Sequence, residues 1–384
     1  MFFHIANQHQ ENYPCHWQLG GFCVSTDTGW AMTIHGNATI LYKGYADFAD
    51  LLDLLPAIVV QTTPRILGNF CALVLVGNTL TIQTNRYRSF PIYIDSNSIN
   101  NLIPGNRTAW TDQLVTVHAD LAVTENTFDV IGTTDLVPSN IDQIDELLTN
   151  KIQAFVLHNQ LPIRVFLSGG VDTLLVYSYL RRLNINHELV WNLHTDFDEF
   201  YLANSDDLQK HWGYQQIHHW RESCVLASGS PGDEFTLRSP NTANLFLLNH
   251  RTSIPEQLDL QNNCLHREYF KRIENTELFK CQHENFKPSE NIVWDICNNI
   301  SNDWQHWHLG NTMTWTPLRD LELTKLILSL PFDQIISQIM NSSISRKLIE
   351  RNVPGLTRVL SDQKNTGNVF RNLQVLLNHG CQDV

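Results

Sequence analysis

Short apolar runs separated by turn-forming residues fill the first part of the chain. Each run is bounded by Gly, Asn, Asp or Thr, a pattern typical of β-strands joined by tight turns. The runs are residues 22–24 (FCV), 38–42 (ATILY), 72–76 (ALVLV) and 80–82 (LTI). We predict a β-rich segment over residues 15–95, interrupted by one short helix near 48–55. A loop is expected over residues 95–110, and two more short strands within 111–138.

Apolar residues recur at helical spacing beyond residue 138. They predict an amphipathic helix that follows Pro138 and has Ser139 as its N-cap. The residues of its apolar face are Ile141, Ile144, Leu148, Ile152 and Phe155. Further on, strands are predicted at residues 189–193 and 224–226, and most of residues 240–350 is predicted to be helical.

A strand, a glycine turn and a helix are predicted in immediate succession over residues 164–180, RVFLSGGVDTLLVYSYL. The apolar run stops at residues 168–173, and a helical pattern follows at once. Such a junction directs backbone N–H groups and the positive end of a helix dipole at one small volume, which suits a phosphate or a pyrophosphate. The alternative is an ordinary glycine turn before a helix.

Each polar or glycine residue of this turn has a possible role around a phosphate. Gly169 and Gly170 allow the backbone to come close to the anion. Ser168 and Thr173 add hydroxyl donors. Asp172 is a candidate ligand for Mg²⁺, which binds to carboxylate and phosphate oxygens.

Composition narrows the classes of function. The formal net charge of −13 disfavours a nucleic-acid partner. The chain has no apolar run of about 18 residues and begins without the pattern of a signal peptide, so we expect no membrane partner. The 8 cysteines include no CxxC pair, and the 17 histidines lack the spacing of a zinc site. We therefore expect reduced thiols and a cytoplasmic protein.

The turn SGGVDT at residues 168–173 resembles the SGGxD[ST] signature of the PP-loop family, also called the ATP pyrophosphatases. Members of that family split ATP between its α- and β-phosphates, which gives an adenylated intermediate and pyrophosphate. The pattern is distinct from a Walker motif because no GK[ST] follows the glycines.

Further partial matches, in the same order along the chain, resemble the asparagine synthetase family. They are residues 161–173 (like DVPVGxxLSGGxDS), 198–219 (like a segment ending in LGxxHH), 228–234 (like SGxGxDE), 316–331 (like xPFLDxxLxxxxxxLP) and 362–364 (like RxKxxF). Their shared order makes the resemblance more specific than any one motif does.

Two N-terminal segments extend the resemblance. Residues 67–74 resemble the LxGxFAxxxxD strand, and residues 85–93 the RDxxGxxPLYY segment, of the glutaminase domain in asparagine synthetases. The resemblance implies an α/β protein with an Ntn-hydrolase-like β-sandwich domain over residues 1–130. It implies a PP-loop, adenine nucleotide α-hydrolase-like parallel-sheet domain with a helical C-terminal part over residues 131–384.

The glutaminase nucleophile of that family is missing. Phe2 stands where the family has a cysteine that its own α-amine activates. The loss resembles β-lactam synthetases and lasso-peptide cyclases, which keep a glutaminase-like domain without its activity. We therefore expect no glutamine hydrolysis, and ammonia or another amine as the nucleophile.

The resemblance implies ATP and Mg²⁺ as cofactors and a set of site residues. The implied nucleotide-binding residues are Leu167, Ser168, Gly169, Gly170, Val171, Asp172, Thr173, Leu193, Ser228 and Gly229. Asp172 and Asp233 are the implied ligands of Mg²⁺. Lys364 and Asp172 are the implied catalytic residues, with Lys364 stabilising negative charge during the reaction.

These expectations describe an ATP-dependent amide-forming ligase. It would adenylate the carboxylate of a small molecule or peptide and transfer the acyl group to ammonia or another amine. Two alternatives stay open: a PP-loop enzyme that modifies a nucleobase or tRNA, and a non-catalytic nucleotide-binding relative.

Overall fold

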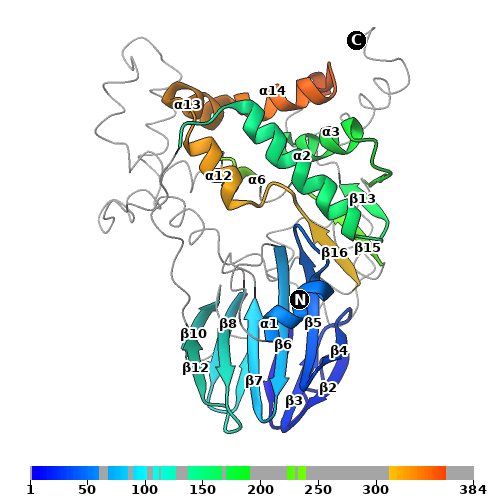
Figure 1. Cartoon of the computed structure of the whole chain (residues 1–384), viewed down its shortest axis with the longest axis vertical. Coiled ribbons are helices and arrows are strands. Elements are labelled where there is room, and N and C mark those ends of the chain that lie inside the picture. The colour runs from blue at the N-terminus through cyan, green and yellow to red at the C-terminus, as the bar shows by residue number, and fades with distance from the viewer. Residues whose placement is uncertain are drawn as a thin grey trace.

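The computed structural model of the protein describes residues 2–59, 68–84, 90–101, 107–111, 114–126, 137–166, 170–190, 223–229, 232–238 and 311–359. In these residues, two antiparallel sheets form the N-terminal part, and a parallel four-stranded sheet with helices follows (Figure 1). The protein therefore has the mixed α/β architecture that the sequence predicts.

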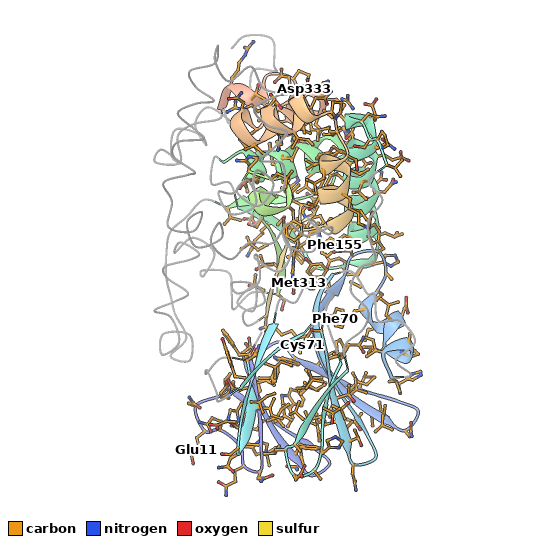
Figure 2. All side chains as sticks on the ribbon, turned by 90° about the vertical axis from the view of Figure 1, so that its left-hand side faces the viewer. Glu11, Phe70, Cys71, Phe155, Met313 and Asp333 are labelled. Atoms are coloured by element: carbon orange, nitrogen blue, oxygen red, sulfur yellow. The ribbon has the colours of Figure 1, made fainter. Side chains whose placement is uncertain are left out.

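The two antiparallel sheets have six strands each, and their side chains meet between them (Figure 2). The first sheet, in the order β10-β8-β9-β1-β3-β2, contains β1 (Phe3–Ala6), β2 (Cys15–Leu19), β3 (Phe22–Thr26), β8 (Phe90–Asp95), β9 (Ser98–Asn100) and β10 (Arg107–Thr111). The second, in the order β12-β11-β7-β6-β5-β4, contains β4 (Ala31–His35), β5 (Ala38–Ala46), β6 (Gly68–Val76), β7 (Thr79–Thr84), β11 (Leu114–Val117) and β12 (Val123–Asn126). The four predicted strands lie in β3, β5, β6 and β7, and β11 and β12 confirm two strands within residues 111–138.

Strand β6 is buried on both faces, which explains its continuous apolar run. Cys71 and Leu73 belong to the core between the two sheets, whereas Phe70 and Ala72 pack in a second core with helix α1 (Leu51–Val59). Successive strand residues point to opposite faces, so a strand that is covered on both sides needs apolar residues throughout.

Two N-terminal predictions need correction. Helix α1 begins at Leu51 rather than at residue 48, because the Asp50 carboxylate accepts a hydrogen bond from the N–H of Leu52 at 2.9 Å and starts the helix there. The loop expected over residues 95–110 is wrong, because β9 and β10 lie in it. Strand β9 pairs with both β1 and β8. Hydrogen bonding to these two neighbours holds it as a strand, although its polar composition favours a loop.

The parallel sheet has the order β14-β13-β15-β16. Its strands are β13 (Ile163–Phe166), β14 (Glu188–Val190), β15 (Cys224–Ala227) and β16 (Thr312–Trp315). The described helices of this part are α2 (Ile141–His158), α3 (Val171–Arg182), α6 (Gly232–Phe235), α12 (Leu321–Leu328), α13 (Phe332–Asn341) and α14 (Ser343–Asn352), followed by the 3₁₀ turn η3 (Leu356–Val359). Strands β14 and β15 overlap the predicted strands, and residues 321–350 are largely helical as predicted, whereas β16 was not predicted. None of the helices in the described ranges is long and apolar enough to cross a membrane.

Helix α2 is capped by Asn140 and not by Ser139. The Asn140 side chain accepts hydrogen bonds from the N–H groups of Asp142 and Gln143, and the Gln143 side chain accepts one from the N–H of Asn140. This reciprocal arrangement is a capping box. Ser139 lies one residue too early, and its hydroxyl instead donates to the carbonyl of Leu326 in α12.

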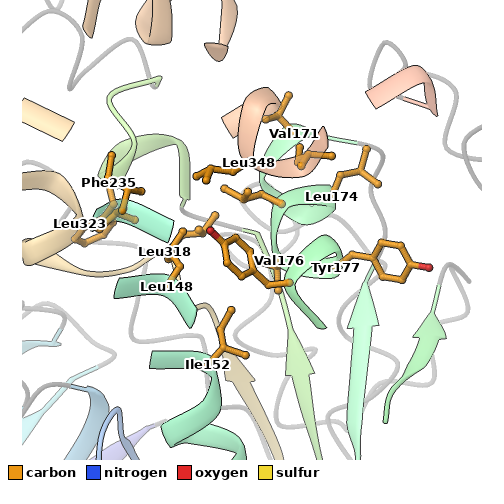
Figure 3. Packing of buried hydrophobic residues seen from close by; sticks show 14 of the residues in the cluster. Leu148, Ile152, Val171, Leu174, Val176, Tyr177, Phe235, Leu318, Leu323 and Leu348 are labelled. Atoms are coloured by element: carbon orange, nitrogen blue, oxygen red, sulfur yellow. The ribbon is translucent and has the colours of Figure 1, made fainter. Parts of the chain in front are cut away.

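Helix α3, which follows the glycine turn, is buried on nearly every side. Leu174, Val176 and Tyr177 are at most 1% exposed, and they share one core with α2, α12 and α14 (Figure 3). Such burial is unusual for a helix at the surface of a domain and fits a central position. The start of α3 is therefore held by packing along the whole helix.

One buried cation joins the N-terminal sheets to the helices. The Lys151 ammonium on α2 lies 3.0 Å from the Asp47 carboxylate, just after β5, and 2.9 Å from the Asp320 carboxylate, the N-cap of α12. It also donates to the carbonyl of Arg319 at 2.8 Å. The Lys151 side chain is 0% exposed, so a single ammonium ties three distant segments together away from water.

The charges in this junction depend on one another. Burial by itself lowers the pKa of Lys151, but the carboxylates of Asp320 and Asp47 outweigh it and hold the pKa above its ordinary value. Burial raises the pKa of Asp47, and Lys151 offsets this only in part. Lys151 therefore stays charged, and the ionised form of Asp47 relies on it.

Aromatic packing closes the same junction. Tyr45 of β5 meets Phe155 of α2 edge to face, with ring centroids 5.2 Å apart, and Phe155 stacks on Trp315 of β16 at 4.0 Å. Figure 2 shows Phe155 and Met313 where the two parts meet. Aromatic pairs of this kind add about 0.5–1.5 kcal/mol each beyond the area they bury.

Replacing Lys151 with Met should lower the free energy of unfolding by about 3–5 kcal/mol, because two buried carboxylates lose their cation. Urea unfolding followed by circular dichroism measures this change. Lys325→Met is the matched control, since Lys325 pairs with Glu322 at the surface, and its loss should cost less than about 0.5 kcal/mol. Equal effects of the two substitutions would contradict the role given to Lys151.

Asp145 should make stability sensitive to acid. Burial by itself raises its pKa, but hydrogen bonds from Arg182 and Tyr179 outweigh it and hold the pKa below the ordinary 3.8. A lowered folded pKa gives stability that is present above pH 3.8 and lost as the pH falls through the folded pKa. The stability difference between wild type and Asp145→Asn should therefore shrink below that pH in urea titrations. A constant difference would contradict this assignment.

Candidate functional site

The strand order places two of the predicted motifs at the same edge of the parallel sheet. From β13 the chain passes through α3 to β14 on one side, whereas β15 lies on the other side of β13 and is followed outward by β16. Ligands of open α/β sheets bind at the carboxyl ends of the strands at such a switch point. Gly170–Thr173 follow β13, and Ser228 and Gly229 follow β15, so both loops lie there.

Helix α3 begins at the glycine turn without a side-chain cap. Gly170 is its N-cap, with extended backbone at φ −75° and ψ 158°. Asp172 lies in the first helical turn, and Thr173 next to it is buried. A helix start of this kind, with small residues before it, is the arrangement that binds phosphates and other anions.

The two loops touch through glycine. A Cβ atom on Gly229 would overlap the backbone nitrogen of Thr173 and the carbonyl carbon of Asp172. A Cβ on Gly232 would lie 3.2 Å from the Asp172 side chain. Ser228 is fixed by its own N–H, which donates to the carbonyl of Trp315 at 2.8 Å. Glycine is thus required where the loop after β15 lies against the first turn of α3.

Asp172 forms an ion pair with Arg238. Nη1 of Arg238 donates to the Asp172 carboxylate, and Nε donates to the hydroxyl of Ser342 at 2.7 Å. Ser342 connects α13 to α14, so the guanidinium joins the glycine turn to the C-terminal helices. The side chains of Asp172 and Arg238 are only 16% and 17% exposed.

Backbone strain marks both ends of this connection. Leu237, directly before Arg238, has φ 58°, and Ser342 has φ 55°. Non-glycine residues rarely adopt this left-handed region, and each costs about 1–3 kcal/mol unless its surroundings enforce it. Buried Gln338 supplies such enforcement: it donates to the carbonyl of Thr236 at 3.2 Å and accepts from the N–H of Ile344 at 2.9 Å.

The described residues do not by themselves form a metal site. In the described ranges, no three His, Cys, Asp or Glu side chains lie together in a way that could hold a metal ion. Asp172 is engaged by Arg238, and for Asp233 only the backbone, within α6, is described. Binding of Mg²⁺ by Asp172 and Asp233 therefore stays a prediction.

Several predicted site residues cannot be compared with the structure. Leu167, Ser168, Gly169, Leu193 and Lys364 lie outside the described residues. Within them, Gly229, which follows Ser228, lies against Asp172 and Thr173, which follow Gly170 and Val171. Nucleotide binding by these residues stays a prediction.

Arg238 and Ser342 were missed from the sequence. Arg238 lies five positions after Asp233 in the quoted segment CVLASGSPGDEFTLRSP, so a cation near an anion-binding turn was the available signal. Ser342 gave no signal, because nothing in its neighbourhood of the sequence points to a residue 104 positions away.

A separate cavity of about 250 Å³ lies at the opposite edge of the sheet. Leu161, Ser223 and Asn311 line it, and they precede β13, β15 and β16; Lys43 and Gly44 of β5 line its other side. We place the candidate site at the glycine turn instead, because ligands of such sheets bind at the carboxyl ends of the strands.

Comparison with known proteins gives no family. No protein-family model matches the chain, and no curated protein matches it in sequence. The functional argument therefore rests on the geometry of the glycine turn and on the resemblance of its motifs.

Replacing Gly229 with Ala should lower the free energy of unfolding by about 1–3 kcal/mol, because the new methyl group overlaps the backbone of Thr173. Thermal and urea unfolding test this. The control is Gly21→Ala, whose Cβ would have nothing within 4 Å and should change stability by less than about 0.5 kcal/mol. If Gly229→Ala is as stable as the control, the two loops are not in contact.

Proposed function

We propose that the protein is an ATP-dependent amide-forming ligase of the asparagine synthetase type. In this proposal residues 131–384 form a PP-loop domain that binds ATP and adenylates the carboxylate of a small molecule or peptide. Residues 1–130 form an Ntn-hydrolase-like domain that has lost its glutaminase activity. Ammonia or another amine completes the amide.

The observation that carries the proposal is the meeting of two motif-bearing loops. The turn SGGVDT and the segment SGSPGDE resemble one family in sequence, although Thr173 of the first and Gly229 of the second are 56 positions apart. In the described residues, Gly229 lies against Asp172 and Thr173 at the switch point of the sheet. Neighbouring parallel strands bring the loops after them together in any such sheet, so the support comes from finding two segments of one motif set in these two loops.

The proposed chemistry asks the protein mainly to bind and orient. A carboxylate oxygen of the substrate forms a bond to the α-phosphorus, the bond to the β-phosphate oxygen breaks, and pyrophosphate leaves. The start of α3, where the positive end of the helix dipole lies, is suited to hold phosphate oxygens in line for this step. The amine then attacks the acyl carbon, AMP leaves, and the proton of the amine passes to solvent.

Two cysteines of the N-terminal part, Cys15 and Cys71, are poor candidates for a glutaminase nucleophile. Burial raises the pKa of the Cys71 thiol, and burial together with the charge of Asp27 raises that of Cys15. A glutaminase needs a thiolate, whose population falls as the pKa rises. Neither of these two thiols is therefore suited to replace the nucleophilic cysteine that the family has where Phe2 stands here.

A nucleotide-binding protein without turnover is the second candidate. The ion pair between Arg238 and Asp172 favours it, because the pair engages a carboxylate that the ligase proposal places in the reaction. The two candidates differ in whether ATP is consumed.

The test is an incubation with ATP, Mg²⁺ and pooled carboxylates, with either ammonium or glutamine, followed by separation of the nucleotides. We expect AMP and pyrophosphate with one carboxylate pool and ammonium, and no amide with glutamine alone. Formation of ADP would contradict the PP-loop proposal. Binding of ATP without turnover in any pool would favour the second candidate.

Asp172→Asn should reduce AMP formation at least about 100-fold, because the neutral side chain no longer holds a positive charge in place next to the phosphates. Asp333→Asn is the matched control, since Asp333 is an exposed carboxylate in the first turn of α13 (Figure 2). Circular dichroism checks that both variants fold. Full activity of Asp172→Asn would exclude Asp172 from the site.

A further inference from the structure

The guanidinium of Arg238 pairs with the Asp172 carboxylate in the first turn of α3. The sequence predicts this carboxylate as a ligand of Mg²⁺. Resting on the proposed function, we infer that Arg238 is a phosphate-binding residue that replaces a divalent cation at Asp172. ATP would then bind to the glycine turn without a metal ion bridging the protein and the phosphates.

The argument begins with charge. A carboxylate beside a triphosphate repels it, and nucleotide sites ordinarily remove this repulsion with Mg²⁺ held between carboxylate and phosphates. Here the positive charge belongs to the chain itself. The positive charge of the Arg238 guanidinium offsets the negative charge of Asp172, and its remaining N–H groups can donate to phosphate oxygens.

The geometry leaves the guanidinium able to bind an anion. Its contacts with Asp172 and Ser342 engage Nη1 and Nε, so Nη2 is the atom that would donate to a phosphate oxygen. Two contacts hold the planar guanidinium in one orientation. A guanidinium fixed in this way can direct its N–H donors at a phosphate. The side chain is 17% exposed, so it is accessible to a ligand yet mostly shielded from water.

The strained backbone gives independent support for a functional position. Leu237 and Ser342 each hold a left-handed conformation, and they are the residue before Arg238 and the residue that binds its Nε. Strain that the surroundings maintain on both sides of one side chain is typical of ligand clamps and active sites.

Calorimetric titration with ATP, in EDTA and separately in excess Mg²⁺, tests the inference. The wild-type dissociation constants in the two conditions should agree within about threefold. Arg238→Gln should weaken binding in EDTA by about 10–100-fold, the loss expected for a charge-assisted hydrogen bond. Excess Mg²⁺ should restore most of that loss, because the carboxylate of Asp172 is then released for the metal.

Three further variants make the result specific. Arg238→Lys keeps the charge and should retain part of the binding in EDTA, although it lacks the planar fork. Ser342→Gly accepts the positive φ, removes the CH₂OH side chain that binds Nε of Arg238, and should weaken binding in EDTA while the fold stays stable. Arg164→Gln, at the start of β13 in an exposed pair with Glu188, should bind as wild type does.

The outcomes separate this inference from the proposed function. Wild-type binding that requires Mg²⁺ would overturn the role of Arg238 and leave the ligase proposal standing. Unchanged binding by folded Arg238→Gln in EDTA would do the same. Failure of ATP to bind in either condition would overturn both.

Discussion

The ammonium of Lys151 is the interaction on which the arrangement of the whole molecule depends. It neutralises carboxylates from the end of β5 and from the start of α12, and it does so at a fully buried position on α2. In water such pairs contribute little, but a buried charge without its partners is costly. The N-terminal sheets, α2 and α12 are therefore fixed to one another by one side chain, with the stack of Tyr45, Phe155 and Trp315 packed beside it.

This junction also positions the candidate site. Helix α2 holds α3 through Asp145, which accepts from the hydroxyl of Tyr179 at 2.7 Å and pairs with Arg182. Helix α12 holds α6, because the hydroxyl of Thr324 donates to the carbonyl of Phe235 at 3.0 Å. The glycine turn starts α3, and the loop that carries Arg238 follows α6. Both sides of the Asp172–Arg238 pair are thus set by helices that the junction aligns.

Local sequence patterns predicted the helices and strands of this fold well, but they did not predict the contacts between them. Continuous or alternating apolar runs gave the strands, and the glycine turn between an apolar run and a helical pattern gave the start of α3. The cap at Asn140 and the polar strand β9 were missed, because a reciprocal side-chain bond in one case and pairing with two neighbours in the other decided the structure. The pair of Asp172 with Arg238 joins residues 66 positions apart, so only the folded backbone brings it together.

The cation junction also limits how the sequence can change over evolution. Removing one of the three charged side chains leaves the other charges buried without a partner, which is costly. Replacing a whole buried ionic group with apolar residues of similar volume is often neutral or even stabilising. Positions 47, 151 and 320 are therefore coupled: each is intolerant alone, and a viable apolar version requires all of them to change together. A lineage that reached the apolar version would keep the same fold with an uncharged junction. Sequences with only one of the three positions changed would rarely be found.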